Sequence, residues 1–217
     1  MSWARFPSTW IQDGGLQRLG WREYRGGAIG ALLTYLLMLI AQNRAPLDKL
    51  STTQDGVLLT YDFIEQQTNL SRALVARSLK ILVDELGVIK VTHSQQGNRY
   101  RIVGIEEARH ARLPQDLLYS PARGLFAFRA LTFRSKHELN ALKLYLLLLT
   151  FRVNKTTSSR IGYDKISGYL GVQRDAIRPA ISHLINLGLI AVESDESSSL
   201  VKSGHPFNQY LLKGDFS

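Results

Sequence analysis

Residues 60–91 read TYDFIEQQTNLSRALVARSLKILVDELGVIKV, and this stretch decides the fold. It predicts a short helix, a tight turn, a longer helix and a strand, in that order. The same order returns in the second half of the chain, where residues 162–192 read GYDKISGYLGVQRDAIRPAISHLINLGLIAV. An internal repeat sets the architecture before any finer assignment, so we expect one folding unit to occur twice.

Two further blocks extend the repeat. The pattern ALxxYLLxL starts at Ala31 and again at Ala141, and NxYxxxG starts at Asn98 and again at Asn208, so both blocks are shifted by 110 residues. The middle blocks match at a shift of 102, so the first copy carries eight extra residues before Tyr61. The stretch 45–56 (APLDKLSTTQDG) is rich in turn formers and is the natural place for them. Three matched blocks in the same order favour a duplication over chance.

The repeat divides the 217 residues into four parts. An N-terminal extension, 1–27, is expected to pack on a first domain, 28–104. A basic connecting segment, 105–136, leads to a second domain, 137–217. The apolar run 28–41 predicts an enclosed helix, and it is shorter than the roughly 20 residues that a membrane span needs. We therefore expect no membrane partner.

Composition limits the classes of function. Apolar residues make up 45% of the chain, which suits a packed globular protein. The net charge of +9 favours a polyanionic partner, with nucleic acid ahead of an anionic membrane. Disulfides, thiolate metal sites and cysteine nucleophiles are excluded because the chain has no cysteine. The first residues lack the pattern of a secretory signal, so a cytoplasmic location is expected.

The sequence does not indicate an enzyme. Its five histidines are scattered without metal-ligand spacing, and it lacks a phosphate-cradling glycine loop, a nucleophile elbow and a paired-carboxylate motif. Asp62 and Asp164 fall in the first turn of a predicted helix, where a carboxylate suits the positive end of the helix dipole. We interpret them as capping residues, and we expect no cofactor, no metal and no small-molecule substrate.

The tight turn has the same design in both copies. Asn69 and Gly171 occupy equivalent places, and these two residue types enter the left-handed backbone region most readily. Each of them therefore predicts the end of a helix. Ser71 is a good N-cap for the helix that follows, whereas its counterpart Gln173 is a poor one. The turn is expected to be a helix-turn-helix corner.

The longer helix has an apolar stripe with i, i+4, i+7 spacing, which marks its core face. The stripe comprises Val75, Leu79, Leu82 and Leu86 in the first copy and Ile177, Ile181 and Leu184 in the second. Its opposite face combines small residues, which allow close approach, with cations that reach phosphates or guanine edges. An ordinary solvated face is the plain alternative, but the position after a corner in both copies favours DNA contact. The candidate DNA-binding residues on this helix are Ser71, Arg72, Ala73, Ala76, Arg77, Lys80, Arg174 and Arg178.

After this helix, the first copy predicts a two-stranded hairpin with a Gly-Asn turn at residues 97–98. Arg99 and Arg101 are two residues apart, so they should project from one face and complete the candidate DNA-binding set. The corresponding tip of the second copy, 193–199, holds three carboxylates that would repel phosphates, and Pro179 disturbs its longer helix. We expect the first copy to make the stronger DNA contact, while the second binds DNA weakly or binds a protein.

The flanking segments are expected to complete the core. Three tryptophans in residues 1–29 most simply cover the core of the first copy, with base stacking as the alternative. Residues 125–131 (LFAFRAL) are too apolar for a free tether, so we expect them to pack against the second copy.

The blocks 64–89 and 166–190, each closing with Leu-Gly-(Val/Leu)-Ile, resemble the winged helix-turn-helix superfamily. The resemblance covers about residues 28–104 and 137–214. It implies a mainly α fold with small β-wings (α+β), in two tandem winged-helix domains. Two such modules in one chain are similar in layout to plasmid-type replication initiators, in which one module binds an origin repeat and the other binds DNA or pairs with a second copy.

The resemblance implies a non-enzymatic protein that binds double-stranded DNA, either a transcription regulator or a replication initiator of a mobile element. Self-association or a protein partner through the second domain is compatible with this layout. The alternative is a subunit of a larger assembly that uses its winged helices for protein or RNA contacts. The cationic face of the first copy favours DNA, and the acidic tip of the second favours the alternative.

Overall fold

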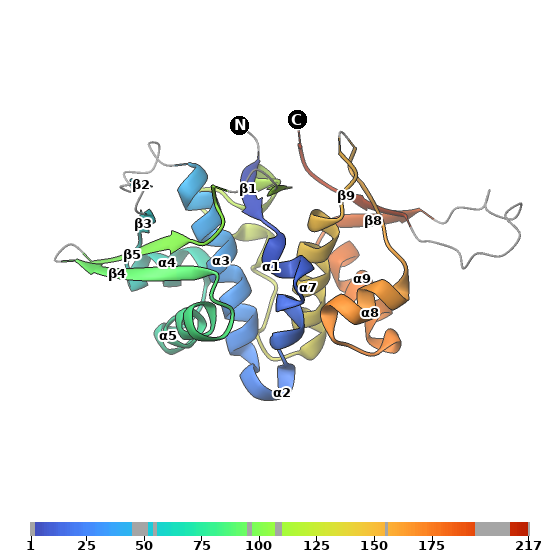
Figure 1. The fold of residues 1–217 in the computed structure, drawn as a ribbon, viewed down its shortest axis with the longest axis horizontal. Helices are drawn as coiled ribbons and strands as arrows, with labels where there is room; N and C mark the ends of the chain where they lie inside the picture. Colours follow the sequence, from blue (N-terminus) through green and yellow to red (C-terminus); the bar gives the residue numbers. More distant parts are fainter. Residues whose placement is uncertain are drawn as a thin grey trace, which may run out of the picture.

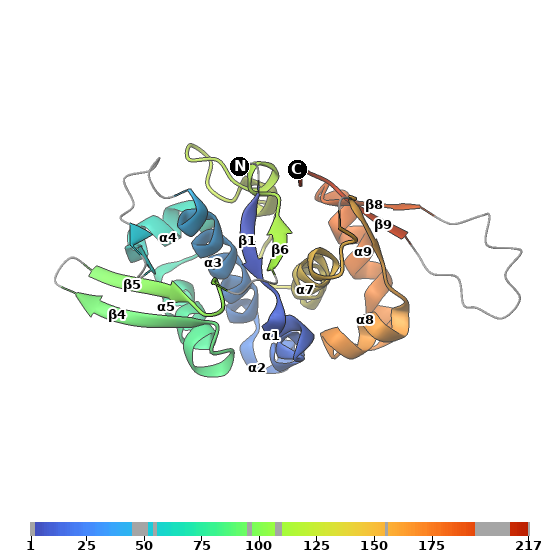
Figure 2. The ribbon, with the colours of Figure 1, turned by 45° about the horizontal axis from the view of Figure 1, so that its top comes forward.

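Two long helices lie side by side at the centre of the protein (Figures 1 and 2). The computed structural model describes residues 3–44, 52–53, 56–94, 97–106, 110–154, 156–193 and 209–216. The central helices are α3 (Gly26–Asn43) and α7 (Lys136–Thr150), which carry the matched apolar blocks. Tyr35 and Tyr145, which are equivalent in the repeat, are both fully buried. The enclosure predicted for these helices is therefore confirmed.

The helix α3 has 18 residues and is longer than the apolar run 28–41 on which the prediction was based. Among the described helices, α3 alone is long and apolar enough to cross a membrane. However, 89% of it is buried inside the protein. The core helix of a globular protein meets the same criterion of length and hydropathy.

The first half continues with two shorter helices and a sheet. Its elements are α4 (Tyr61–Thr68), α5 (Arg72–Lys80), a π-helical turn η2 (Ile81–Glu85), β4 (Ile89–Ser94) and β5 (Gly97–Ile102). The predicted two-stranded hairpin proves to be part of a larger sheet, because β3 (Gly56–Leu58) pairs with β5 and β2 (Thr52–Thr53) pairs with β3. Strands of two and three residues are too short to show an alternating pattern. Gly97 and Asn98, predicted as the hairpin turn, already belong to β5.

The second half repeats this order with a three-stranded sheet of order β7-β9-β8. Its elements are β7 (Ser158–Arg160), α8 (Tyr163–Leu170), a 3-10 turn η4 (Arg174–Ala176), α9 (Ile177–Asn186), β8 (Ile190–Glu193) and β9 (Gln209–Leu212). Of the predicted acidic tip, Glu193 is the last residue of β8, and 194–199 lie outside the described residues. Small antiparallel sheets and helices make the protein an α+β fold, as predicted.

The N-terminal extension packs on both halves and not on the first alone. It forms β1 (Ala4–Pro7), α1 (Thr9–Gln12), a 3-10 turn η1 (Gly15–Arg18) and α2 (Trp21–Tyr24). The ring of Trp10 meets that of Tyr35 on α3 edge to face, at 5.7 Å between centroids. Gln17 Nε2 reaches the other half and donates to the carbonyl of Gly168, at 2.7 Å. These contacts join residues far apart in sequence, so no local pattern predicts them.

A buried lysine ties the same extension to the second half. Lys143, on α7, is 2% exposed, and its Nζ donates to the carbonyl oxygens of Leu19 at 3.2 Å and Leu170 at 2.5 Å. Burial disfavours the charged ammonium and lowers the pKa of Lys143 to about 8. The equivalent position in the first half is Leu33, which is also buried.

The connecting segment also contacts both halves. It contains β6 (His110–Leu113), which pairs with β1, then α6 (Gln115–Leu118) and a 3-10 turn η3 (Phe126–Phe128). Phe128 packs against Tyr145 of α7, as expected for a segment that covers the second half. Leu125, however, donates its backbone N–H to Gln67 of α4, at 2.8 Å. The buried apolar side chains therefore form one continuous core through both halves.

Candidate nucleic-acid interface

The corner between α4 and α5 is built as predicted. Thr60 caps α4 and accepts a hydrogen bond from the backbone N–H of Phe63, at 3.1 Å. Asn69 ends the helix in the left-handed region, with φ 59° and ψ 25°. Gly171 ends α8 at the equivalent place, with φ 64° and ψ 40°. Two helices separated by such a turn hold the second at a fixed angle to the first.

The two copies differ in how the next helix starts. The Ser71 hydroxyl accepts from the N–H of Leu74, so Ser71 is an N-cap as expected, and α5 begins at once. Gln173 makes no such bond, and the helix after it begins as the 3-10 turn η4. Pro179 is the third residue of α9, within the first turn, where N–H groups have no partner inside the helix. The proline is therefore tolerated, and α9 continues to Asn186.

The helix α5 buries its apolar stripe and exposes its opposite face. Val75, Leu79, Leu82 and Leu86 are at most 6% exposed. Gly30 of α3 lets α5 come close, since a Cβ there would lie 2.3 Å from Ser78 Oγ. On the opposite face, all the predicted residues of the helix are exposed, namely Arg72, Ala73, Ala76, Arg77 and Lys80. These side chains remain exposed, although Arg77 also contacts the N-terminal extension.

The first arginine of each longer helix pairs with an aspartate of the helix before it. Arg72 Nη1 lies 2.5 Å from Asp62 Oδ1 and 3.4 Å from Glu65 Oε2, and its guanidinium stacks over Tyr61. Arg174 makes the equivalent pair with Asp164, at 2.8 Å. The hydrogen bond that Arg72 donates to the Asp62 carboxylate raises the pKa of Arg72, so this side chain stays charged. These pairs are exposed, so they orient the arginines while adding little stability. The two aspartates thus hold arginines in addition to lying in the first helical turn.

The other two cations of α5 differ in freedom. Arg77 lays its side chain over Gly27 and donates through Nη2 to the backbone carbonyl of Glu23, at 3.3 Å. Lys80 makes no hydrogen bond or ion pair with any residue that the structure describes. The face therefore offers one arginine fixed by carboxylates, one fixed by the N-terminal extension and one unconstrained lysine.

The outer face of the hairpin carries the predicted arginines. Arg99 and Arg101 lie opposite Thr92 and Lys90 on β4, so all four side chains project from the same face of the sheet. Tyr100 and Ile102, between and after the arginines, are buried on the other face. Lys90 and Arg101 are exposed, and Arg99 is partly buried. Like charges placed opposite each other repel, which an acidic partner would relieve.

The structure adds cations that the sequence did not assign to the site. The N-terminal extension is docked beside η2, which continues α5: Arg18 of η1 donates to the carbonyl of Glu85 at 2.7 Å, and the Tyr24 hydroxyl of α2 lies near the Glu85 carboxylate. Burial and the two neighbouring glutamates raise the pKa of Tyr24 to about 12. The exposed Arg22 and Arg25 of the extension are thereby brought next to α5. Their signal in the sequence is weak, because α2 has only four residues.

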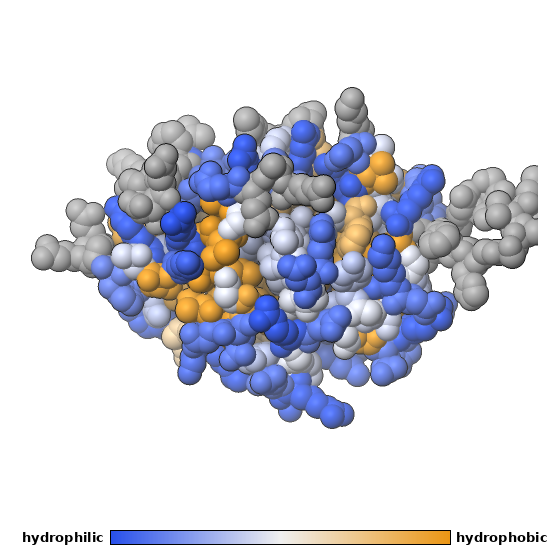
Figure 3. Space-filling model, in the orientation of Figure 1, coloured by the Kyte–Doolittle hydropathy of each residue, from blue (hydrophilic) through white to orange (hydrophobic). Residues whose placement is uncertain are grey.

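The surface view agrees with this layout. Figure 3 shows hydrophilic side chains along the lower edge of the molecule, over α5 and α2, and an apolar patch above them at the base of the β4–β5 hairpin. Val103, directly after β5, is 41% exposed.

The candidate residues do not form one continuous patch. Arg174 and Arg178 are exposed, but they belong to η4 and α9, and Figures 1 and 2 place α9 and α5 on opposite sides of the central helices. Asp175 is also exposed beside Arg174, which halves the local charge. Among the described residues, no group of three or more histidines and carboxylates could hold a metal.

Comparison with known proteins gives no match for this chain, whether with family models, with curated protein sequences or with solved structures. The site is therefore interpreted from its own geometry.

Proposed function

We propose that the protein is a non-enzymatic, double-stranded-DNA-binding protein with two winged-helix modules in tandem. The supporting order of elements is a buried helix, a helix-turn-helix corner and a β-hairpin, present once in each half. The proposal rests above all on the exposed cationic face of α5, which directly follows a capped corner. A transcription regulator and a replication initiator of a mobile element both fit this role, and a cytoplasmic location is expected for either.

In the proposed binding mode, α5 enters the major groove and the hairpin follows the phosphate backbone. Ala73 and Ala76 allow close approach, while Arg72 and Arg77 are held in place before DNA arrives. Pre-positioned side chains lose less entropy on binding. Arg99, Arg101 and Lys90 on the hairpin would neutralise phosphates beside the groove.

The alternative is a subunit of a protein assembly. The exposed apolar patch at the base of the hairpin favours it, because patches of this kind mark protein contacts.

The test is a titration of random-sequence duplex DNA at several salt concentrations. Each phosphate contact should contribute about −0.9 to the log–log slope of affinity against salt. Lys80→Glu should weaken DNA binding about tenfold or more, because it places a carboxylate on the cationic face of α5. Arg160→Glu, at an exposed position on β7, is the matched control and should bind as the wild type does. Failure of the wild type to bind duplex DNA at low salt would favour the assembly subunit.

A further inference from the structure

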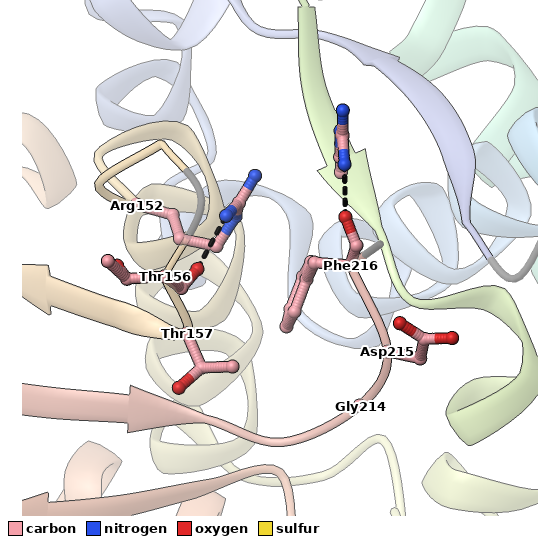
Figure 4. Close-up of a pocket in the computed structure, with 7 residues that line it drawn as sticks. Arg152, Thr156, Thr157, Gly214, Asp215 and Phe216 are labelled. Carbon is pink, nitrogen blue, oxygen red and sulfur yellow. Dashed lines mark hydrogen bonds between the residues drawn. The ribbon is translucent and has the colours of Figure 1, made fainter.

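A cavity of about 690 Å³ opens between the connecting segment and the second half (Figure 4). Two arginines line it, Arg112 from β6 and Arg152 just after α7. Thr156 and Thr157 add two hydroxyl groups, and the segment that follows β9 closes the cavity with Phe216. The residues come from three separate parts of the chain, so no local sequence pattern identifies them as a group.

The two guanidinium groups are held by backbone and ring contacts. Arg112 donates to the carbonyl of Phe216 and lies over the ring of Trp3, at 4.5 Å from its centroid. Arg152 donates to the carbonyl of Thr156 at 2.6 Å and lies over the ring of Phe216, at 4.7 Å. Each guanidinium has five N–H donors, so both retain donors beyond these contacts. Within the described residues, neither guanidinium forms an ion pair with a carboxylate.

The described residues around Arg152 leave one of its N–H donors unpaired and disfavour its positive charge. Its Nε is buried and has no hydrogen-bond partner among the described residues. Partial burial lowers the pKa of Arg152, and the positive charge of Arg112 lowers it further. Asp215 also lines the cavity, but Figure 4 shows its carboxylate directed away from Arg152. Among the described lining residues, two cations and one carboxylate give the cavity a net positive charge.

We propose that this cavity binds a small phosphorylated molecule, with its phosphate group between Arg112 and Arg152. Guanidinium groups present paired donors that match phosphate oxygens, and the Thr157 hydroxyl can donate a further hydrogen bond, whereas the Thr156 hydroxyl already donates to the carbonyl of Val153. The volume lies within the range of small-molecule sites, so it has room for more than a bare phosphate.

The position of the cavity assigns the phosphate to a free ligand and not to DNA. Figure 1 shows the segment that follows β9, which lines the cavity, on the opposite side of the molecule from α5 and α2. A straight duplex lying on α5 would not reach it. The inference does not depend on DNA binding, and its first test contains no DNA.

The test is calorimetric titration with inorganic phosphate and with pyrophosphate, at constant ionic strength set by chloride. The wild type should bind both ligands saturably, with dissociation constants below about 10 mM. Arg112→Gln and Arg152→Gln should each lose about tenfold or more in affinity, and Arg160→Gln should lose none. Thr157→Val keeps both arginines and should lose less phosphate affinity than either arginine variant. It replaces them as the test if an arginine variant fails to fold.

The proposal is overturned if the wild type shows no saturable binding, or if both arginine variants bind phosphate as well as Arg160→Gln does. A second arm assigns the source of the phosphate. Arg112→Gln should leave duplex-DNA affinity unchanged, whereas a tenfold loss, with phosphate competing against DNA, would overturn the assignment to a free ligand.

Discussion

The turn before α5 and the turn before η4 and α9 hold the same place in the repeat but are stabilised differently. In the first half, the hydroxyls of Thr60 and Ser71 cap both helices of the corner. In the second, Gly162 and Gln173 contribute no side-chain cap, and the helix starts with a 3-10 turn. The left-handed residue that ends the first helix of the corner is kept in both. The backbone turn is thus the fixed element, and the caps vary around it.

The contact between the central helix and the longer helix also differs between the halves. Gly30 on α3 faces Ser78 on α5 at very short range. The corresponding positions in the second half are Asn140 and Ala180, both buried, so the larger side chain has moved to the central helix. Asparagine and alanine together are larger than glycine and serine, so the second half fills this contact with a larger pair of side chains.

The largest expected difference between the halves is in DNA affinity. Arg72→Ala with Arg77→Ala should weaken duplex binding about 100-fold and reduce the salt slope by about 2, because two phosphate or base contacts are lost. Arg174→Ala with Arg178→Ala should cost less than about threefold, since Asp175 already opposes the approach of phosphate. Fluorescence anisotropy across a salt series measures both quantities. A larger loss from the second pair would reverse our assignment of the stronger contact.

The next difference lies between Lys143 and its equivalent Leu33. The pKa of Lys143 is lowered to about 8 in the folded protein, from 10.5. Between these values the unfolded chain binds more protons, so the free energy of unfolding should rise with pH. The expected gain from pH 7 to 10 is about 2–3 kcal/mol, and below pH 8 this contribution should be constant.

Urea denaturation at intervals of one pH unit measures this dependence. The series ends at pH 10 because the raised pKa of Tyr24 acts in the opposite direction above its unfolded value. Lys143→Leu should abolish the rise, and Lys165→Met, at an exposed position, should retain it. A rise that persists in Lys143→Leu would rule out this lysine as its source.

A smaller effect is expected from the close approach of α3 and α5. Gly30→Ala places a Cβ 2.3 Å from Ser78 Oγ and should lower stability by about 1–3 kcal/mol. Adding Ser78→Ala removes the clashing oxygen and should restore most of the loss. Gly168→Ala is the matched change in the second half, where nothing lies within 4 Å, and it should stabilise by about 0.5–1 kcal/mol. Thermal unfolding distinguishes the three variants.

The smallest effect concerns the caps. Ser71→Ala should lower stability by about 1 kcal/mol, because the N–H of Leu74 loses its acceptor. Gln173→Ser supplies the missing acceptor and should raise stability by up to about 1 kcal/mol. The same thermal unfolding assay applies. Equal and negligible shifts in both variants would show that the backbone turn alone sets the helix start.

The predictions made from the sequence succeed where the determinant is local. Asn69 and Gly171 adopt the predicted left-handed conformation, Ser71 caps α5, and Arg99 and Arg101 share a face. Each of these features depends on residues within one turn of helix or one pair of strands.

The features missed are those in which distant segments meet. The contact of Gln17 with Gly168 spans 151 residues, and the hydrogen bond of Arg112 to Phe216 spans 104. No spacing or periodicity in the sequence indicates such contacts. Only the three-dimensional structure shows that the N-terminal extension packs against both halves and that two arginines line one cavity.

The pairing of β1 with β6 has a consequence for biosynthesis. Ala4 lies opposite Leu113, so β1 has no partner until more than 100 further residues have been translated. Closing so long a loop is slow. Until it closes, the unpaired edge of β1 can pair with strands of neighbouring chains. Expression of the first half alone should therefore extend through Leu113, because any earlier stop leaves that edge open.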